Sequence, residues 1–494
     1  MAKICISLVP KNTVDALSHM TLLAGQADLF ELRVDAMEEC DLAAILAART
    51  KPVIVTNRAA NEGGCRDCPA AERVKVQAEA VRLGADYVDV ELAALGEFER
   101  LVPPAARGKT KLIVSYHDLV TMPSDLERKA RQIEATSADV VKVVGTAQRV
   151  EDNLPVFAAL RAVKKPAIAL AMGECGQMSR VLAGKFGALL TFASAWTGEE
   201  SAPGQIDART MRELYRADRL GPATKVYAVM GNPVEHSLSP AIHNTAFAAC
   251  GLDAVYVRLK VEGDPAQAVR ALAAVPVEGY SVTIPHKEAV MAACTQIDEL
   301  SLRMRAVNTL LRRGDGYQAT NTDVTSAMRV LAAAVGAECF AGKRALVVGA
   351  GGVGRAYVHG LTSRGAEVFV TDVDAARRES VGAETGATPL EPGEIGQVQV
   401  DILMNGSPLG MWPKVDATPV DAKLLRRGTV VFDAVYNPRE TRLLREAAQA
   451  GCVTVSGVEQ FVGQAVEQFE LWTGRQAPEP LMRQVVLDAL AEKH

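Results

Sequence analysis

Residues 343–356 read KRALVVGAGGVGRA, an apolar strand followed by a glycine-rich turn and the start of a helix. In this setting Gly349 permits a tight turn, Gly351 lets a ligand approach the backbone, and Gly354 lets the helix pack against the strand. The free amides at the start of such a helix suit a pyrophosphate. Asp372 ends the next apolar run, about 20 residues further on, where an acidic side chain can bind a ribose hydroxyl. The stretch therefore predicts a doubly wound α/β domain that binds a dinucleotide.

The first 220 residues show a different pattern, in which short apolar runs alternate with helical stretches. Eight such runs cover residues 4–9, 29–35, 52–58, 87–92, 111–117, 139–145, 166–173 and 189–195. Most of the stretches between them have the 3.6-residue periodicity of an amphipathic helix. Eight strand–helix units in about 215 residues match the number and size of a (β/α)8 barrel. Polar side chains gather at the ends of the runs, which form the active-site face of such barrels.

The chain of 494 residues is long enough for several domains, at roughly 150 residues each. A polar, turn-like stretch, YRADRLGPATK (215–225), precedes a new strand pattern that begins with KVYAVMGNP. We predict an α/β protein with a (β/α)8 barrel over residues 1–220, an α/β substrate domain over 225–325, a Rossmann-type dinucleotide-binding domain over 326–455, and C-terminal helices packing back on the substrate domain over 456–494.

The composition excludes several classes of protein. A hydrophobic fraction of 49% and a charged fraction of 23% are typical of soluble globular proteins. The net charge of -5 gives no basic surface for nucleic acid or an anionic membrane. No apolar run reaches the roughly 18 residues of a membrane helix. The first residues, MAKICISLVP, lack the features of a signal or transit peptide, so we expect a cytoplasmic protein.

The nine cysteines are odd in number and scattered, which favours a reducing compartment over a disulfide framework. Cys65 and Cys68 form the one close pair, in the sequence CRDC. They can be two free thiols in a loop, a thiol switch or half of a zinc site. Zinc needs two further ligands, and no second CxxC or HxxxH supplies them, so no metal is expected.

The first candidate site centres on Lys142, which lies inside the apolar run ADVVKVVG (138–145). An amine buried at an inward barrel position is a candidate Schiff-base nucleophile toward a ketone, although a lysine at a strand end can also point outward. His117 ends the preceding run and is a candidate general acid and base. Glu31, Arg33, Arg58 and Arg180 add a cluster suited to a carboxylate substrate.

Six motifs, ELRVD (31–35), TNRAANEGG (56–64), SYHD (115–118), VVKVVG (140–145), SRVLAG (179–184) and SAPGQI (201–206), together resemble type I 3-dehydroquinate dehydratase. The resemblance implies that Lys142 forms an imine with the C3 ketone of 3-dehydroquinate. It also implies that His117 takes the C2 proton and protonates the departing C1 hydroxyl, while Glu62 holds and polarises His117. The substrate contacts that it implies are Ser7, Glu31, Arg33, Arg58, Arg180, Ser201 and Gln205. The segment 65–68 departs from the family pattern.

Seven further motifs cover the rest of the chain: GNPVEHSLSPAIHN (231–244), SVTIPHKE (281–288), AVNTL (306–310), NTD (321–323), NGSPLGM (405–411), DAVYNP (433–438) and GVEQFVGQAVEQF (457–469). This set resembles shikimate dehydrogenase. The resemblance implies that Lys287 and Asp323 act at the C3 hydroxyl, and a lysine beside an aspartate can relay that proton while a nicotinamide takes the hydride. The implied substrate contacts are Ser237, Ser239, Thr283, Asn308, Tyr436 and Gln464, and the cofactor contacts are Gly349, Gly351, Gly352, Val353, Gly354, Asp372 and Gly457.

The cofactor region departs from the family pattern. Most shikimate dehydrogenases have an Asn-Arg-Thr element that grips the 2′-phosphate of NADP, whereas this chain has Asp372, Val373 and Asp374. A carboxylate there should bond the ribose 2′-hydroxyl of NAD(H) and repel a 2′-phosphate. Arg377 and Arg378 can reach back to a phosphate, so the sequence favours NAD(H) and leaves NADP(H), the family default, open.

The whole chain is thus expected to be a bifunctional shikimate-pathway enzyme. The first alternative is a dehydratase fused to an NAD-linked quinate/shikimate dehydrogenase that works in the catabolic direction. A second is a ligand-sensing regulatory protein, which has no need for Lys142, His117, Lys287 and Asp323 together. The expected partners are the small molecules 3-dehydroquinate, 3-dehydroshikimate and shikimate, without nucleic acid or membrane, in a monomer or homodimer.

Overall fold

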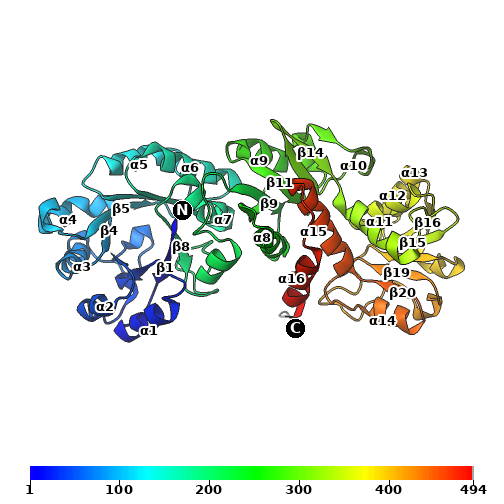
Figure 1. Cartoon of the computed structure of the whole chain (residues 1–494), viewed down its shortest axis with the longest axis horizontal. Helices are drawn as coiled ribbons and strands as arrows, with labels where there is room; N and C mark the ends of the chain where they lie inside the picture. The colour runs from blue at the N-terminus through cyan, green and yellow to red at the C-terminus, as the bar shows by residue number, and fades with distance from the viewer. Residues whose placement is uncertain (492–494) are drawn as a thin grey trace. The chain divides into compact units, whose positions relative to one another are not determined.

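The computed structural model describes residues 1–491 and divides the chain into two compact units (Figure 1). The first unit comprises Met1–His236 and Leu252–Val277, and the second comprises Ser237–Gly251 and the chain from Glu278 onward. The end of the predicted C-terminal segment, residues 492–494, lies outside the described residues.

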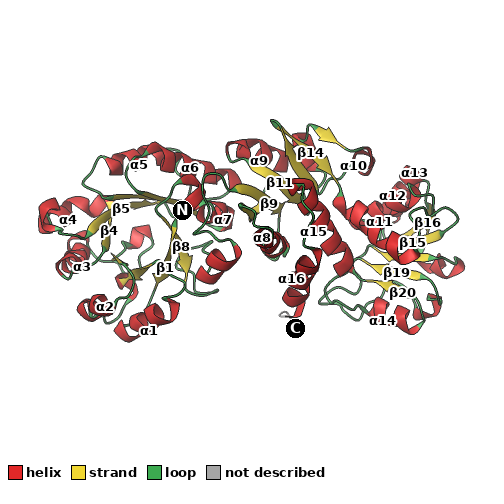
Figure 2. Ribbon diagram, viewed as in Figure 1, coloured by secondary structure: helices red, strands yellow, loops and turns green. Residues whose placement is uncertain are grey.

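The first unit contains the predicted barrel. Its strands are β1 (Lys3–Leu8), β2 (Leu29–Arg33), β3 (Val53–Thr56), β4 (Tyr87–Glu91), β5 (Lys111–His117), β6 (Val140–Thr146), β7 (Ala167–Met172) and β8 (Leu190–Ser194). All pairs are parallel in the order β7-β6-β5-β4-β3-β2-β1-β8, as the alternating pattern predicts. The surrounding helices are α1 (Thr13–Leu23), α2 (Leu42–Ala48), α3 (Ala70–Arg82), α4 (Leu95–Leu101), α5 (Leu126–Glu134), α6 (Asn153–Ala162) and α7 (Gln177–Val181) (Figure 2). The fold class is confirmed, and every strand end lies within two residues of its predicted run.

The barrel interior changes from apolar to polar along the strands. Leu29, Ile54, Ile113 and Val140 belong to one buried hydrophobic cluster. Two residues further along the same strands come Glu31, Thr56, Ser115 and Lys142, which are also buried. Because side chains repeat on one face with a period of two, each polar residue lies on the same inward face as its apolar predecessor. The apolar layer closes the barrel below a layer of polar and charged groups.

The first unit continues beyond the barrel with β9 (Lys225–Gly231), β10 (Ala254–Lys260) and α9 (Pro265–Ala271), and β9 and β10 pair in parallel. The connecting segment is anchored to the barrel, because Lys185 donates to the carbonyls of Pro222 and Thr224. Thr224 donates to Asp253 ahead of β10.

The second unit contains two groups of strands. In the first, β11 (Val277–Val282), β13 (Thr309–Arg313) and β14 (Gly316–Thr320) pair antiparallel, and β12 (Gln296–Ile297) joins β14 in parallel. The second is a parallel sheet of β17 (Thr388–Leu390), β16 (Glu367–Thr371), β15 (Arg344–Val348), β18 (Ile402–Asn405), β19 (Val430–Asp433) and β20 (Val453–Val455), in that order. Numbered along the chain the order is 3-2-1-4-5-6, the doubly wound arrangement that the glycine-rich stretch predicts.

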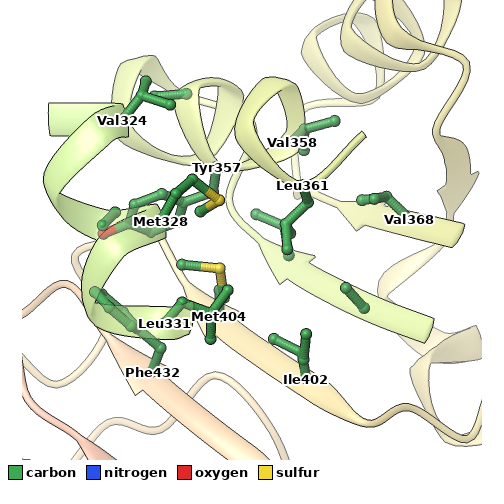
Figure 3. Packing of buried hydrophobic residues seen from close by; sticks show 14 of the residues in the cluster. Val324, Met328, Leu331, Tyr357, Val358, Leu361, Val368, Ile402, Met404 and Phe432 are labelled. Carbon is green, nitrogen blue, oxygen red and sulfur yellow. The ribbon is translucent and has the colours of Figure 1, made fainter. Parts of the chain in front are cut away.

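Helices cover both faces of this parallel sheet. On one face α11 (Thr322–Val335) and α12 (Gly352–Thr362) bury Met328 and Leu361 against Ile402 and Met404 (Figure 3). On the other face α14 (Arg442–Gln449) packs on the sheet, whereas α13 (Ala375–Thr385) places Val381 in the same cluster as α11 and α12. Sheets buried on both faces carry continuous apolar strands, and ALVV and ILM are such strands.

The last helices return to earlier parts of the second unit. α15 (Gly457–Thr473) packs along α11, and α16 (Glu479–Ala491) packs against α8 (Ser239–Ala249) and α15. α10 (Glu299–Met304) completes the described helices of this unit. Within residues 1–491 no helix is long and apolar enough to span a membrane.

Candidate active sites

A cavity of about 310 Å³ opens at the carboxyl ends of the barrel strands. Nine of the ten residues that the sequence places in this site line it: Glu31, Arg33, Arg58, Glu62, His117, Lys142, Arg180, Ser201 and Gln205. The tenth, Ser7, lines a neighbouring cavity and donates its hydroxyl to Glu31 Oε2 at 2.6 Å. Ser7 therefore orients Glu31 from outside the main cavity.

Lys142 is 4% exposed and lies among carboxylates. Its Nζ is 2.8 Å from Asp89 Oδ2 and 3.6 Å from Glu31 Oε1. The other face of the ammonium lies 4.4 Å from the ring centre of Phe192. This lysine is inward, as the nucleophile hypothesis requires, and its charge is matched by buried carboxylates.

Asp89 is a central residue of this site that the sequence analysis missed. Besides Lys142, it pairs with Arg58 at 2.8 Å and accepts the Ser115 hydroxyl at 2.6 Å. Burial opposes its ionisation, but the charges of Arg58 and Lys142 outweigh burial and hold the pKa of Asp89 well below its ordinary value. Glu91 accepts from Arg58 and Arg73 in the same way. The signal was the run YVDVEL, because acids two residues apart in a barrel strand point to the same face.

His117 is held by Glu62, as the resemblance implies. Glu62 Oε2 lies 2.9 Å from His117 Nδ1 and also accepts the His117 backbone amide at 3.0 Å. Burial, with the nearby charges of Arg58 and Lys142, keeps the pKa of His117 well below 6.5, so the imidazole is neutral near pH 7. Burial raises the pKa of Glu62 to about 7. A neutral imidazole fixed at one nitrogen is suited to accept a proton at the other.

The three arginines differ in their counter-charges. Arg33 donates two hydrogen bonds to the carboxylate of Asp35, and Arg58 forms ion pairs with Asp89 and Glu91. Arg180 is 1% exposed, and its hydrogen bond within residues 1–491 is to the carbonyl of Pro203, at 3.3 Å. Its Nε is buried without a partner in that range, and burial lowers its pKa to about 10. A buried guanidinium without an acidic partner is a ready site for an anion.

The second site, in the second unit, is built around Lys287 and Asp323. Lys287 Nζ lies 2.5 Å from Asp323 Oδ2. Asp323 occupies the first turn of α11, where Asn321 caps the helix and accepts the Asp323 amide. The Lys287 carbonyl accepts the amide of Val307, which fixes the turn after β11. The structure thus brings together two residues that are 36 positions apart in the sequence.

Asn308 and three glutamines on one face of α15 lie near Lys287 and Asp323 or the residues next to Asp323 in the fold. Asn308 Oδ1 accepts the Thr322 amide at 2.7 Å, whereas its Nδ2 is buried without a partner among the described residues. Such a donor can bind a substrate hydroxyl. Gln460 donates to the Asp323 carbonyl and Gln468 to Thr309, so Gln464 lies between them at four-residue spacing on one face of α15. Gln460 and Gln468 were missed, although GVEQFVGQAVEQF shows the spacing.

The remaining predicted substrate residues occupy the surrounding loops. Ser237 Oγ accepts the amide of Ser239, which begins α8. The Tyr436 ring stacks on Phe461 of α15, with 4.9 Å between ring centres. Thr283 directly follows β11.

The glycine-rich turn has the geometry of a dinucleotide cradle. Gly349 has a φ of +97°, and a Cβ on Gly354 would lie 1.7 Å from the Gly349 carbonyl oxygen. Gly351 has open space around it, and α12 begins at Gly352, with Val353 partly buried against the core. Gly457 packs tightly, because a Cβ would lie 2.4 Å from the Ala434 oxygen. These residues fit the predicted cofactor.

The end of β16 carries an acidic residue with fixed geometry. Asp372 accepts the Ala350 amide at 2.6 Å through one oxygen and the Asp374 amide at 2.8 Å through the other. Val373 is 93% exposed. Arg378 is buried, donates to the Asp372 carbonyl and pairs with Glu391.

Cys65 is exposed, Cys68 is partly buried, and both are free thiols. Within residues 1–491 no cluster of three or more His, Cys, Asp or Glu side chains is arranged to hold a metal ion.

Comparisons with known proteins identify relatives for both halves of the chain. The family described as type I 3-dehydroquinase matches residues 4–222, the shikimate dehydrogenase substrate binding domain matches 229–310, and the shikimate 5′-dehydrogenase C-terminal domain matches 457–487. The chain is 38% identical over 482 residues to the chloroplastic bifunctional 3-dehydroquinate dehydratase/shikimate dehydrogenase of Arabidopsis thaliana, covering 93% of this chain and 80% of that protein.

Two further relatives match the second half of the chain. The shikimate dehydrogenase (NADP(+)) of Moorella thermoacetica is 39% identical over 280 residues, which cover 54% of this chain and 94% of that protein. The crystal structure of shikimate 5-dehydrogenase from Listeria monocytogenes with shikimate and NAD superimposes with a TM-score of 0.50 and 28% identity, covering 54% of this chain and 98% of that one.

Fold, sites and comparisons define a fused enzyme, a barrel lyase joined to a nicotinamide-linked oxidoreductase. The chain belongs to the bifunctional 3-dehydroquinate dehydratase/shikimate dehydrogenase family. It dehydrates 3-dehydroquinate to 3-dehydroshikimate and reduces that product to shikimate, two consecutive steps of the shikimate pathway.

Proposed function

We propose that Arg180 is the group that selects the anionic substrate of the dehydratase. The observation that carries this proposal is its burial without a carboxylate partner in the cavity that also holds Lys142. The carboxylate of 3-dehydroquinate supplies the missing charge. The neighbouring Ser201 and Gln205, which bond to each other, bind substrate hydroxyls from the same rim.

The chemistry then takes place between Lys142 and His117. As the Lys142 nitrogen adds to the C3 carbonyl, two protons of its ammonium group pass to the carbonyl oxygen, which leaves as water, and a protonated imine remains. This cation draws electrons from the neighbouring carbon, so His117 can remove the C2 proton and leave an enamine. The enamine expels the C1 hydroxyl, which takes the same proton from His117 and leaves as water. Hydrolysis of the imine releases 3-dehydroshikimate and restores the amine, and Asp89 faces the nitrogen while it is charged.

Trapping tests the dehydratase proposal. Borohydride added with 3-dehydroquinate should leave one covalent adduct on Lys142, detected by peptide mass spectrometry. Lys142→Met should remove the adduct while shikimate oxidation continues. An adduct on another lysine would overturn the assignment of Lys142.

For the dehydrogenase we propose that Lys287 and Asp323 hold the C3 oxygen and move its proton. Their 2.5 Å contact gives one hydrogen-bonded unit that can pass a proton to or from that oxygen. The carboxylate and the other hydroxyls of shikimate are bound by six surrounding residues: Ser237, Ser239, Thr283, Asn308, Tyr436 and Gln464. The nicotinamide cofactor, when bound, supplies or accepts the hydride. The glycine-rich turn would hold the pyrophosphate of this cofactor through Gly349, Gly351, Gly352, Val353 and Gly354. Gly457 lets α15 approach the backbone of Ala434.

We further propose that the cofactor is NAD(H), although the relative from Moorella thermoacetica is an NADP(+) enzyme. Three features support NAD(H). Asp372 places a carboxylate at the strand end, Val373 offers no charge to a 2′-phosphate, and Arg378 is held by Glu391 and the Asp372 carbonyl. Of Arg377 and Arg378, Arg377 is the exposed one, and it pairs with Asp374 at 3.3 Å.

Initial rates of shikimate oxidation test the cofactor. We expect kcat/KM with NAD to exceed that with NADP at least tenfold, and Asp372→Asn with Val373→Arg to narrow or reverse the ratio. Arg377→Ala is the matched control and should leave the ratio unchanged. A wild-type preference for NADP that Arg377→Ala removes would overturn the proposal. Quinate oxidation at a rate comparable to that of shikimate would favour the catabolic alternative.

We also propose a cytoplasmic location, because nine dispersed thiols are typical of a reducing compartment. We propose that the enzyme is a monomer or homodimer that requires no metal and no macromolecular partner, which light scattering and activity after chelator treatment would test.

A further inference from the structure

Lys260, the last residue of β10, has no role in either reaction as described, yet it lies among three carboxylates. Its Nζ is 2.6 Å from Glu174, 3.5 Å from Glu262 and 3.7 Å from Glu235. The Lys260 side chain is 22% exposed, so water screens these pairs only in part. Glu174 belongs to the barrel, whereas Glu235 follows β9, and all four residues are in the first unit.

On the barrel side, Glu174 belongs to the turn that supports the substrate rim of the dehydratase. Its neighbour Gly173 donates its amide to the Pro203 carbonyl, the same oxygen that receives Arg180. Gly204 lies so close to this turn that a Cβ would be 2.2 Å from the Gly173 oxygen. Glu174 is therefore one residue away from the backbone group that packs against the loop between Ser201 and Gln205 and bonds to the partner of Arg180.

On the other side, Glu235 belongs to the segment that leads from β9 to Ser237 and Ser239. One Glu235 oxygen faces Lys260, and the other accepts the Val234 amide at 2.9 Å. Both oxygens of the carboxylate are therefore held in place. Ser237 is two residues further along the chain. The conformation of this segment therefore determines the positions of Ser237 and Ser239, the serines proposed to bind shikimate.

We propose that Lys260 is a positioning residue for both active sites, because one ammonium group fixes the turn beneath the dehydratase rim and the segment that enters the shikimate-binding loop. This inference rests on the roles proposed for Arg180, Ser237 and Ser239. Lys260 touches neither substrate. By fixing both loops it stabilises the binding geometry of each, so its loss should weaken substrate binding and leave the chemical steps intact.

Steady-state kinetics of both activities in the full chain test this proposal. We expect Lys260→Met to raise the KM for 3-dehydroquinate and the KM for shikimate by about fivefold each, with each kcat within about twofold, since partly exposed ion pairs have effects of this size. Lys260→Arg should restore both KM values. Glu174→Gln should raise mainly the dehydratase KM, and Glu235→Gln mainly the dehydrogenase KM.

Glu262→Gln is the matched control, because Glu262 contacts the same ammonium but no substrate loop, and both KM values should stay unchanged. The proposal is overturned if Lys260→Met changes only one KM, if it lowers kcat at constant KM, or if Glu262→Gln has the same effect as Lys260→Met. If Lys260→Met does not fold, the separate effects of Glu174→Gln and Glu235→Gln decide. Failure of the proposed roles themselves would show differently, as an unchanged dehydratase KM in Arg180→Met.

Discussion

Replacing Arg180 by methionine should make the enzyme more stable and a poorer dehydratase. The guanidinium is 1% exposed, has no acidic partner within residues 1–491, and is held by one carbonyl. A charge buried in this way destabilises the folded protein unless a ligand pairs with it. Methionine removes the charge and keeps most of the unbranched apolar stem.

The magnitude follows from the pKa. Burial lowers the pKa of Arg180 from 12.5 to about 10. At about 1.4 kcal/mol per tenfold, this corresponds to roughly 3 kcal/mol against the charged form in the folded protein. The full cost is present at pH 7, because the guanidinium is charged there in both the folded and the unfolded protein, and it is lost as the pH rises from about 10 to 12.5. Allowing for the space that methionine leaves, we expect a gain of about 1–3 kcal/mol.

Urea unfolding of the full chain, followed by tryptophan fluorescence and by loss of dehydratase activity, measures the gain. In steady-state assays without urea, the dehydratase kcat/KM of Arg180→Met should be about 10²–10³-fold lower than that of the wild type. This is the cost of removing one partner of a buried charged contact. Arg209→Met, at an exposed arginine paired with Glu213, is the matched control. A variant that is less stable than the wild type and binds 3-dehydroquinate normally would refute the reasoning.

Four other substitutions or conditions are expected to give clear results. Lys142→Met should lower dehydratase kcat at least about 10³-fold and leave the dehydrogenase within about twofold, in separate assays of the two activities. Because the pKa of His117 is lowered, its imidazole should remain neutral below pH 6.5 in an NMR titration of the ring; protonation of the ring above pH 6.5 would contradict this, whereas a loss of activity near pH 7 would report Glu62, whose pKa is about 7. Lys287→Met should lower dehydrogenase kcat about 10²–10³-fold, and undiminished turnover would exclude it as the proton-transfer partner. Asp89→Asn should cost about 3–5 kcal/mol in urea unfolding, because Arg58 and Lys142 lose a shared counter-charge, whereas an unchanged midpoint would show that water replaces it.

Much of the fold could be predicted because its signals are local. Each barrel strand is a short apolar run with polar residues at its end, and the glycine-rich turn specifies its own strand–turn–helix geometry. The residues that reach the cavities also lie in contiguous motifs. Lys142 was found as a charge inside an apolar run, and the structure places it in the cavity with His117 and Arg180.

What escaped sequence analysis depends on contacts between distant positions. Asp89 belongs to an ordinary strand pattern, and its partners come from elsewhere in the barrel, Lys142 from β6 and Arg58 from the segment after β3. The sequence leaves Arg378 available to a phosphate because its partner Glu391 comes 13 residues later, beyond β17. Lys260 and Glu174 are 86 residues apart. No local periodicity or motif reports such pairs, because only the folded chain brings them together.

The return of α15 and α16 to α11 and α8 has a consequence for how the enzyme is made. The barrel sequence is complete once the ribosome has synthesised about 222 residues. Domains generally fold as units during synthesis. The second unit cannot close until the helices from Gly457 onward emerge, since α15 carries the side chains that bond to Asp323 and Thr309. At roughly 10 residues per second, the dehydratase therefore has about 25 seconds to fold and act before the dehydrogenase exists. A nascent chain stalled short of Gly457 should dehydrate 3-dehydroquinate and reduce nothing.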